Sequence, residues 1–308
     1  MIWKKLSRKK TAKMKQYRFG YVAILGRPNV GKSTILNRII GQKIAIATNK
    51  AQTTRRRING IYTSDEAQIV FVDTPGIHKP VDGLGEVLVD EAKSALKDID
   101  LVLFVVDGST SSGRGDRWIV DNVLGKSPEI PMFIVVNKSD LIKDEIKKEE
   151  NIVSYKTLFE KNISVLKVSA KTGRNFDTLI KNIIRKLPPG EKLYDEDIVT
   201  DENMRNISAE LIREQILLNT RDEIPHSVRV DIVEYKEKEE LDSIRANIVV
   251  EQDSQKAILI GKGGSMLKKI GTAARLEIEE SAGRKVFLEL NVRVEKNWRK
   301  NCRVEKLK

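Results

Sequence analysis

Cysteine is nearly absent from this 308-residue chain, which has one, Cys302, close to its C-terminal end. A lone cysteine cannot close a disulfide within the chain, so a disulfide framework is excluded and a reducing cytosol is the expected surrounding. Long apolar runs are also missing, because no stretch approaches the roughly 20 apolar residues that a membrane-spanning helix needs. The basic segment 1–15 is not followed by an apolar stretch, so we expect no signal peptide.

Acidic residues are scarce at both ends of the chain. Residues 1–17 contain seven Lys or Arg and no acid, and residues 256–308 contain fourteen Lys or Arg against six acids. The net charge of +12 therefore resides at the ends, since the residues between them sum to −3. Basic blocks of this kind favour a polyanionic partner such as RNA, although a solvated basic surface fits the charge alone.

No internal repeat or low-complexity tract is present, but the hydrophobic pattern changes once along the chain. Up to residue 187, nearly continuous apolar runs alternate with helical patterns, which is typical of buried parallel strands in an open, doubly wound α/β sheet. The apolar runs are Phe19–Leu25, Ile69–Val72, Leu101–Val106, Met132–Val136 and Val165–Val168, and the helical patterns include Ser33–Ile40 and Phe176–Leu187.

A second domain of α+β type is expected after Pro188, Pro189 and Gly190, which end the last helix of the first. Its pattern is a helix followed by half-buried strands, namely Met204–Leu218, Val228–Tyr235, Ile244–Val250 and Val286–Val294. We therefore expect a basic extension at 1–18, a first domain at 19–187, a linker at 188–203 and a second domain at 204–308.

The junction after the first strand matches the phosphate-loop pattern G-x-x-x-x-G-K-[ST]. In such a loop, backbone N–H groups surround phosphates at the positive end of a helix. Lys32 is expected to reach the β- and γ-phosphates, and the Ser33 hydroxyl to bind Mg²⁺. A glycine-rich turn with an incidental lysine is the alternative, which the strand before and the helix after it disfavour. The predicted phosphate-binding residues are Gly26, Arg27, Pro28, Asn29, Val30, Gly31, Lys32, Ser33 and Thr34.

Two further segments fit loops that sense a γ-phosphate. Asp73 ends a strand, where its carboxylate can hold Mg²⁺ through water, and the Gly76 N–H can meet the γ-phosphate; a plain Pro-Gly turn is the alternative. One of two adjacent threonines would complete the Mg²⁺ shell only while the γ-phosphate is present. We favour Thr54, because it directly precedes an arginine, and a solvated position also fits Thr53. The predicted metal ligands are Ser33, Thr54 and Asp73, and the predicted switch residues are Gln52, Thr53, Thr54, Arg55, Asp73, Thr74, Pro75, Gly76 and Ile77.

Base specificity is predicted at the ends of the next two strands. A carboxylate at Asp140 can accept from the ring N–H and exocyclic amine of guanine, a donor pair that adenine lacks, so an ATPase is disfavoured. Asn137 would tie this loop to the phosphate loop, the stem of Lys138 would cover the base, and the Ala170 N–H can donate to guanine O6. Each short match is weak alone, but all lie in order at the strand ends where α/β sheets bind ligands. The predicted guanine-binding residues are Asn137, Lys138, Asp140, Ser169, Ala170 and Lys171.

A glutamine that orients the attacking water in many GTPases is absent, and Ile77 stands in its place. An apolar side chain cannot orient water by hydrogen bonding. Hydrolysis must then draw on a backbone group, a monovalent cation, or a group from RNA or another partner, and we expect slow intrinsic turnover.

A G-x-x-G motif lies between two helical patterns of the second domain. In KH domains such a loop lets the backbone approach nucleotides closely, whereas a helix-turn-helix corner is the alternative. The order helix, strand, strand, helix, G-x-x-G, helix, strand favours the KH interpretation, as does the surrounding basic block. The predicted RNA-binding residues are Gly261, Lys262, Gly263, Gly264, Lys268 and Lys269.

Over about residues 19–303 the chain resembles the Era family of bacterial GTPases, which couple a G domain to a type II KH domain. Beyond the nucleotide motifs, the resemblance rests on Thr200-Asp201, Ala209–Glu214, Ile224–Ser227, Leu290, Val294 and Trp298-Arg299. It implies a Ras-like P-loop GTPase domain, GTP/GDP with Mg²⁺ as cofactors, and a KH domain that binds the 3′ end of 16S rRNA. It further implies that the protein acts in assembly of the 30S subunit from its precursor. It also implies a cytoplasmic monomer that associates loosely with the inner membrane, and a K⁺ ion that Asn29 helps to hold.

Two departures from the family pattern stand out: the extra basic segment Met1–Gln16, and the lack of aromatic residues near the G-x-x-G loop. The RNA bases would then stack on aliphatic side chains or on the basic segment at the C-terminal end of the chain. Two other functions stay open. One is an rRNA-anchoring protein whose nucleotide state sets domain orientation with marginal hydrolysis. The other is a tRNA-modification GTPase, which Cys302 disfavours because it lacks the catalytic cysteine motif of those enzymes.

Overall fold

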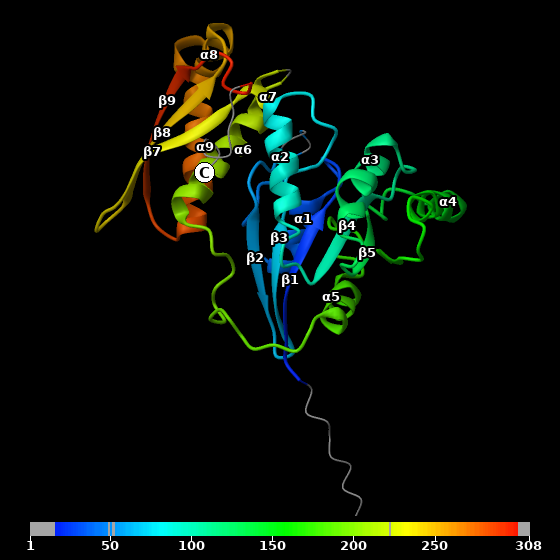
Figure 1. Ribbon diagram of the computed structural model, residues 1–308. Helices are drawn as coiled ribbons and strands as arrows, with labels where there is room; N and C mark the ends of the chain where they lie inside the picture. Colours follow the sequence, from blue (N-terminus) through cyan, green and yellow to red (C-terminus); the bar gives the residue numbers. More distant parts are fainter. Residues whose placement is uncertain (1–15, 49, 51–52, 222, 301–308) are drawn as a thin grey trace, which may run out of the picture.

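Six strands form the sheet of the N-terminal body, in the order β2-β3-β1-β4-β5-β6 (Figure 1). In this computed structural model, which describes residues 16–48, 50, 53–221 and 223–300, neighbouring strands run parallel except β2, which is antiparallel to β3. The strands are β1 Arg18–Leu25, β2 Ile58–Thr63, β3 Ala67–Asp73, β4 Leu101–Asp107, β5 Met132–Asn137 and β6 Ser164–Lys167. The predicted open, mostly parallel sheet is confirmed.

Helices cover both faces of this sheet because successive strand residues point to opposite sides. In β1, Val22 and Ile24 belong to the core under α1 and α5, whereas Ala23 and Leu25 belong to the core under α2, α3 and α4. The helices are α1 Lys32–Ile40, α2 Gly83–Ser94, α3 Arg114–Asn122, α4 Glu145–Lys156 and α5 Phe176–Lys186. Strands buried on both faces explain the continuous apolar runs of the sequence, and their carboxyl ends meet at one edge.

The C-terminal body has a sheet of its own, in the order β7-β8-β9, with β7 antiparallel and β9 parallel to β8. Its elements are α6 Met204–Asn219, α7 Ile224–Ser227, β7 Arg229–Glu237, β8 Asp242–Val250, α8 Asp253–Ile260, α9 Ser265–Ala282 and β9 Val286–Val294. The long helices α6 and α9 lie against one face of the sheet and share its core. The predicted order of helices and strands around the G-x-x-G motif is confirmed.

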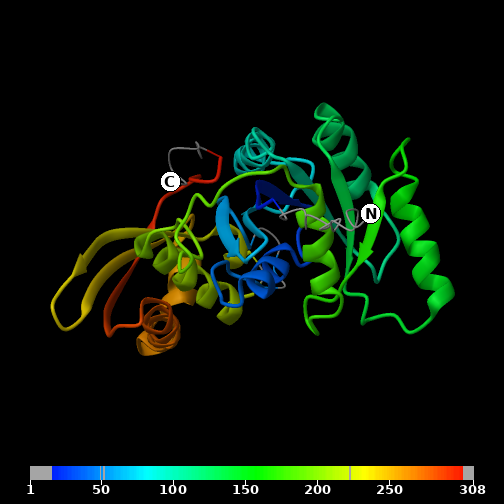
Figure 2. The same ribbon diagram turned by 90° about the horizontal axis from the view of Figure 1, so that it is seen from below.

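The connecting segment 188–203 is held along the edge strand β2 and runs between the two bodies (Figure 2). The Ile61 N–H donates to Val199 O at 2.8 Å, and the Thr200 hydroxyl donates to Asn59 O at 2.7 Å. The buried side chain of Gln68 accepts from the backbone of Leu193 and Tyr194. The segment expected as a linker is therefore an ordered addition to the sheet edge.

The two bodies also meet at Trp298, which follows β9. Its buried indole donates to Ser227 O at 2.8 Å and packs with Leu84 and Leu88 of α2. The guanidinium of Arg55 lies 5.7 Å from the ring centroid, and that of Arg229 lies 5.2 Å from it. Arg55 also donates to the carbonyl of Val228, so a residue of the predicted switch is anchored in the C-terminal body.

Three sequence predictions fall on residues outside the described ranges: Gln52, Cys302 and the basic extension before residue 16. Within those ranges, no helix combines the length and the apolar character that crossing a bilayer requires.

Candidate functional site

The phosphate-loop pattern forms a tight turn between β1 and α1 that only glycine can make at two positions. Gly26 has φ +155° and Gly31 has φ +96°. A Cβ on Gly26 would lie 2.3 Å from Val105 O, and one on Gly31 would lie 2.3 Å from Asn137 Nδ2. The loop is thus pressed against the ends of β4 and β5 and leads into the start of α1, where backbone N–H groups can bind an anion.

Lys32 and Asp73 are buried charged groups at the centre of the site. The Lys32 ammonium donates to the carbonyls of Gly26 (3.2 Å) and Arg27 (3.1 Å). Burial lowers the pKa of Lys32 to about 8, against the opposing effect of Asp73. Burial raises the pKa of Asp73 to about 6, although Lys32 and the Ser33 hydroxyl act in the opposite direction. Such desolvated opposite charges at a strand end are typical of a site that binds a charged ligand.

Three oxygen-bearing side chains converge beside Lys32. The Ser33 hydroxyl donates to Asp73 Oδ2 at 2.7 Å and lies 2.9 Å from Thr54 Oγ1. Asp73 Oδ1 is buried without a hydrogen-bond partner among the described residues. Hydroxyl and carboxylate oxygens suit Mg²⁺, which also needs phosphate and water ligands, and an unpaired carboxylate oxygen supplies one more acceptor. The residues fit the predicted metal.

Thr53 turns away from this cluster. Its hydroxyl donates to Lys50 O at 2.6 Å and lies 2.8 Å from Thr48 Oγ1. Of the two threonines left open by the sequence, Thr54 is therefore the one next to Ser33 and Asp73.

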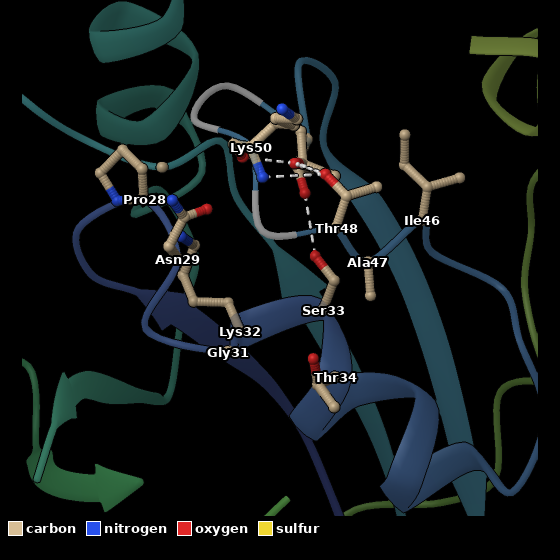
Figure 3. Close-up of a pocket in the computed structure, with 13 residues that line it drawn as sticks. Pro28, Asn29, Gly31, Lys32, Ser33, Thr34, Ile46, Ala47, Thr48 and Lys50 are labelled. Atoms are coloured by element: carbon tan, nitrogen blue, oxygen red, sulfur yellow. Dashed lines mark hydrogen bonds between the residues drawn. The ribbon is translucent and has the colours of Figure 1, made fainter. Parts of the chain in front are cut away.

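A pocket separates the phosphate loop from the segment that precedes β2. Figure 3 shows Pro28, Asn29 and Lys32 on one side and Thr48 and Lys50 on the other. The lining residues are Pro28, Asn29, Gly31, Lys32, Ser33, Thr34, Ile46, Ala47, Thr48, Lys50, Thr53, Thr54 and Gly76. Some residues of each predicted set, namely the phosphate, metal and switch sets, thus line one pocket, among them Lys32, Ser33, Thr54 and Gly76.

Gly76 and Ile77 bring the segment after β3 against the phosphate loop. A Cβ on Gly76 would lie 2.8 Å from Pro28 Cα, and the Ile77 N–H donates to Gly26 O at 3.1 Å. The side chain of Ile77 is 1% exposed and packs in the core under α2. Nothing polar from position 77 therefore reaches the pocket, as the missing glutamine implied.

Asn137 links the loops predicted to bind the base and the phosphates. Its Nδ2 donates to Val30 O, and its Oδ1 accepts from the Ala170 N–H, both at 2.9 Å. Because this N–H is directed at Asn137 here, a contact of Ala170 with guanine stays a prediction. Asp140 and Lys171 are exposed at the same end of the sheet, and Ser169 is buried beside them.

Two acidic residues that no motif marks hold the predicted binding loops. Arg27 belongs to the phosphate loop, yet its Nε donates to the fully buried Asp116 of α3 at 2.8 Å. Lys138 pairs with Asp107, at the end of β4, with 2.6 Å between Nζ and Oδ2. Both pairs join residues far apart in sequence, so only the position of Asp107 at a strand end could have suggested one of them.

The G-x-x-G loop joins α8 to α9 through a short turn at Lys262–Gly264. Gly261, Gly263 and Gly264 all have positive φ, at +72°, +60° and +79°. A Cβ on Gly263 or Gly264 would meet no atom within 4 Å, so the outer side of the loop is open. Lys262, Lys268 and Lys269 are exposed around it, and the exposed Ile258 of α8 adds an aliphatic surface nearby.

Comparison with known proteins decides the family. Residues 21–138 match the family of 50S ribosome-binding GTPases, and residues 223–299 match the KH domain. The chain is 49% identical to GTPase Era of Crocosphaera subtropica over 92% of its length and 90% of that protein. The chain belongs to the Era family of GTPases. Era-family chains are GTP-hydrolysing enzymes with a P-loop GTPase domain and a KH domain, and both bodies described above agree with that architecture.

Two solved Era structures match the chain along nearly its whole length. Era in complex with MgGDPNP and nucleotides 1506–1542 of 16S ribosomal RNA has a TM-score of 0.89 and 40% identity, with 94% of this chain and 97% of that one covered. A point variant of Aquifex aeolicus Era bound to GDP·AlF₄⁻ has a TM-score of 0.88, at the same identity and coverage.

Proposed function

We propose that this Era-family chain binds GTP and Mg²⁺ in the pocket at the start of α1 and binds RNA at the loop 261–264. The RNA we propose is the 3′ end of 16S rRNA, and the process is assembly of the 30S subunit from its precursor. Support comes from a related Era that has been solved with both MgGDPNP and that part of 16S rRNA. The observation that carries the nucleotide part is the Ser33–Thr54–Asp73 cluster beside Lys32.

The proposed roles follow from the geometry. Backbone N–H groups of the phosphate loop and the Lys32 ammonium bind phosphate oxygens, while Ser33, Thr54 and Asp73 hold the metal. Bound Mg²⁺ neutralises negative charge on the phosphates. Asn137 keeps the base loop against the phosphate loop, and Asp140 distinguishes guanine from adenine. Gly76, which lies against Pro28, senses the γ-phosphate through its N–H.

The second candidate is an rRNA-anchoring switch in which hydrolysis is marginal. Arg55 favours it, because the residue after the metal-binding Thr54 lies on Trp298 and donates to Val228 in the C-terminal body. A movement of Thr54 on nucleotide exchange would therefore be passed to the KH domain through Arg55. In this candidate function the nucleotide state acts mainly by setting the orientation of the two domains.

Single-turnover hydrolysis of GTP, with and without a 16S rRNA 3′-end fragment, tests the proposal. We expect slow hydrolysis by the chain alone and a clear acceleration by the fragment, because Ile77 supplies no water-orienting group. Hydrolysis that stays marginal with the fragment bound would favour the anchoring switch. A fragment that does not bind would contradict the RNA part of the proposal.

Potassium is proposed as a further cofactor because Asn29 lies in the phosphate loop, at the mouth of the pocket. A monovalent cation there would supply positive charge where an arginine finger supplies it in other GTPases. We expect faster hydrolysis in K⁺ than in Na⁺ at equal ionic strength, and no such difference in the Asn29→Ala variant. Equal rates of the parent protein in the two salts would rule the cation out.

A cytoplasmic monomer that associates peripherally with the inner membrane surface also stays a proposal, supported by resemblance to the family. The tRNA-modification function stays disfavoured by the sequence, because Cys302 lacks the catalytic cysteine motif of those enzymes; Cys302 itself lies outside the described residues.

A further inference from the structure

The side chain of Lys138 is held by a carboxylate that comes from another strand. Its Nζ lies 2.6 Å from Asp107 Oδ2, and the side chains of Lys138 and Asp107 are 30% and 17% exposed. Lys138 also has φ +59°, in the left-handed region that non-glycine residues rarely adopt. A constrained backbone and a paired ammonium together leave this lysine little freedom.

Asp107 itself is held by hydrogen bonds from Ser109 and Tyr155. Its Oδ1 accepts from the Ser109 N–H at 2.9 Å and from the Ser109 hydroxyl at 2.6 Å, and its backbone carbonyl accepts from the Tyr155 hydroxyl at 3.0 Å. The next residue, Gly108, donates to Asn137 O at 2.8 Å. Burial alone would raise the pKa of Asp107, but hydrogen bonds from Lys138 and Ser109 hold it below its ordinary value. The carboxylate is therefore ionised and preorganised at neutral pH.

We propose that Asp107 is a positioning residue for nucleotide binding, which holds the stem of Lys138 where it covers the guanine base. The inference rests on the proposed guanine site, in which Lys138 and Asp140 contact the base. A lysine stem free to rotate would have to be ordered when the nucleotide binds, and the Asp107 pair removes most of that entropic cost beforehand. Asp107 lies outside the sequence motifs of the site.

The test uses the full-length chain and a fluorescent GDP as the probe. Affinity and dissociation rate are measured for four proteins: parent, Asp107→Asn, Lys138→Ala, which removes the stem, and the double variant. Asn keeps the shape of Asp107 but turns an N–H toward the ammonium. We expect Asp107→Asn to weaken binding about fivefold through faster dissociation, as the loss of a partly buried ion pair allows. GDP and a non-hydrolysable GTP analogue should be affected alike, because both carry the same base.

The double variant separates positioning from general destabilisation. If Asp107 acts through Lys138, the double variant should bind GDP no more weakly than Lys138→Ala alone. Additive losses, or an Asp107→Asn variant with parental affinity, would overturn the inference while leaving the guanine site intact. A Lys138→Ala variant with parental affinity would overturn the proposed guanine contact itself, and the inference with it. Asp121→Asn, at an exposed position of α3, is the matched control, and thermal melting checks that each variant is folded.

Discussion

Replacement of Asp140 by Asn should weaken GTP binding by about 1.5–3 kcal/mol, which is the contribution of a hydrogen bond to a charged group. In the proposed site the carboxylate of Asp140 accepts two hydrogen bonds from guanine, whereas an amide offers one acceptor and one donor. The donor of the amide then faces a donor of the base. Asp140 is exposed at the end of β5 and is not part of the core, so its replacement should leave the fold intact. Calorimetric titration with GDP and GTP measures the effect.

Xanthosine nucleotides supply the internal control for this prediction. Xanthine has a carbonyl where guanine has the exocyclic amine, so the amide of Asp140→Asn can donate to it. The variant should therefore gain affinity for XDP while it loses affinity for GDP. A variant that binds GDP as tightly as the parent would show that Asp140 does not recognise the base. If the variant bound neither GDP nor XDP, the loop would instead be misfolded, which thermal melting would reveal.

The fold and the core of the nucleotide pocket could be predicted from sequence because their signals are local. Apart from the threonine pair before β2, each nucleotide motif follows an apolar run, and parallel strands bring the ends of those runs to one edge. Ser33 and Asp73 are 40 residues apart in the chain but hydrogen-bonded at 2.7 Å for this reason. Strand boundaries differ from the predictions by a residue or two, as at β3, which is predicted at Ile69–Val72 and observed at Ala67–Asp73, because end residues carry little hydrophobic signal.

Contacts that depend on long-range packing could not be predicted. Arg27 fits the phosphate loop by its position, but its side chain pairs with Asp116, which no pattern connects to it. Arg55 was expected in a switch loop, and its anchoring on Trp298 depends on how the two bodies dock. The segment 188–203 has the proline, glycine and acidic residues of a free linker. The Ile61 N–H nevertheless donates to Val199 O, and a hydrogen bond between backbone groups leaves no trace in side-chain patterns.

Binding of the 16S rRNA 3′-end fragment should fall by about tenfold or more when Lys262 and Gly263 are both replaced by Asp, because phosphate contacts dominate affinity for nucleic acids. The change removes one positive charge and adds two negative charges on the open side of the loop. GTP binding should be unchanged, since the pocket at α1 belongs to the other body. Fluorescence anisotropy with a labelled fragment measures the RNA affinity, and calorimetry measures the GTP affinity.

The matched control for this variant is replacement of both residues by Asn. Gly263 has φ +60°, which Asn and Asp tolerate best among non-glycine residues, and a Cβ there meets no other atom. The two double variants therefore share the same backbone cost and differ only in the negative charge, so the Asn pair should retain more RNA affinity than the Asp pair. Salt dependence adds a second readout, since loss of each phosphate contact should lower the slope of log affinity against log salt by about 0.7. A folded Asp pair with parental affinity and slope would place the RNA site elsewhere, on the basic residues that follow β9.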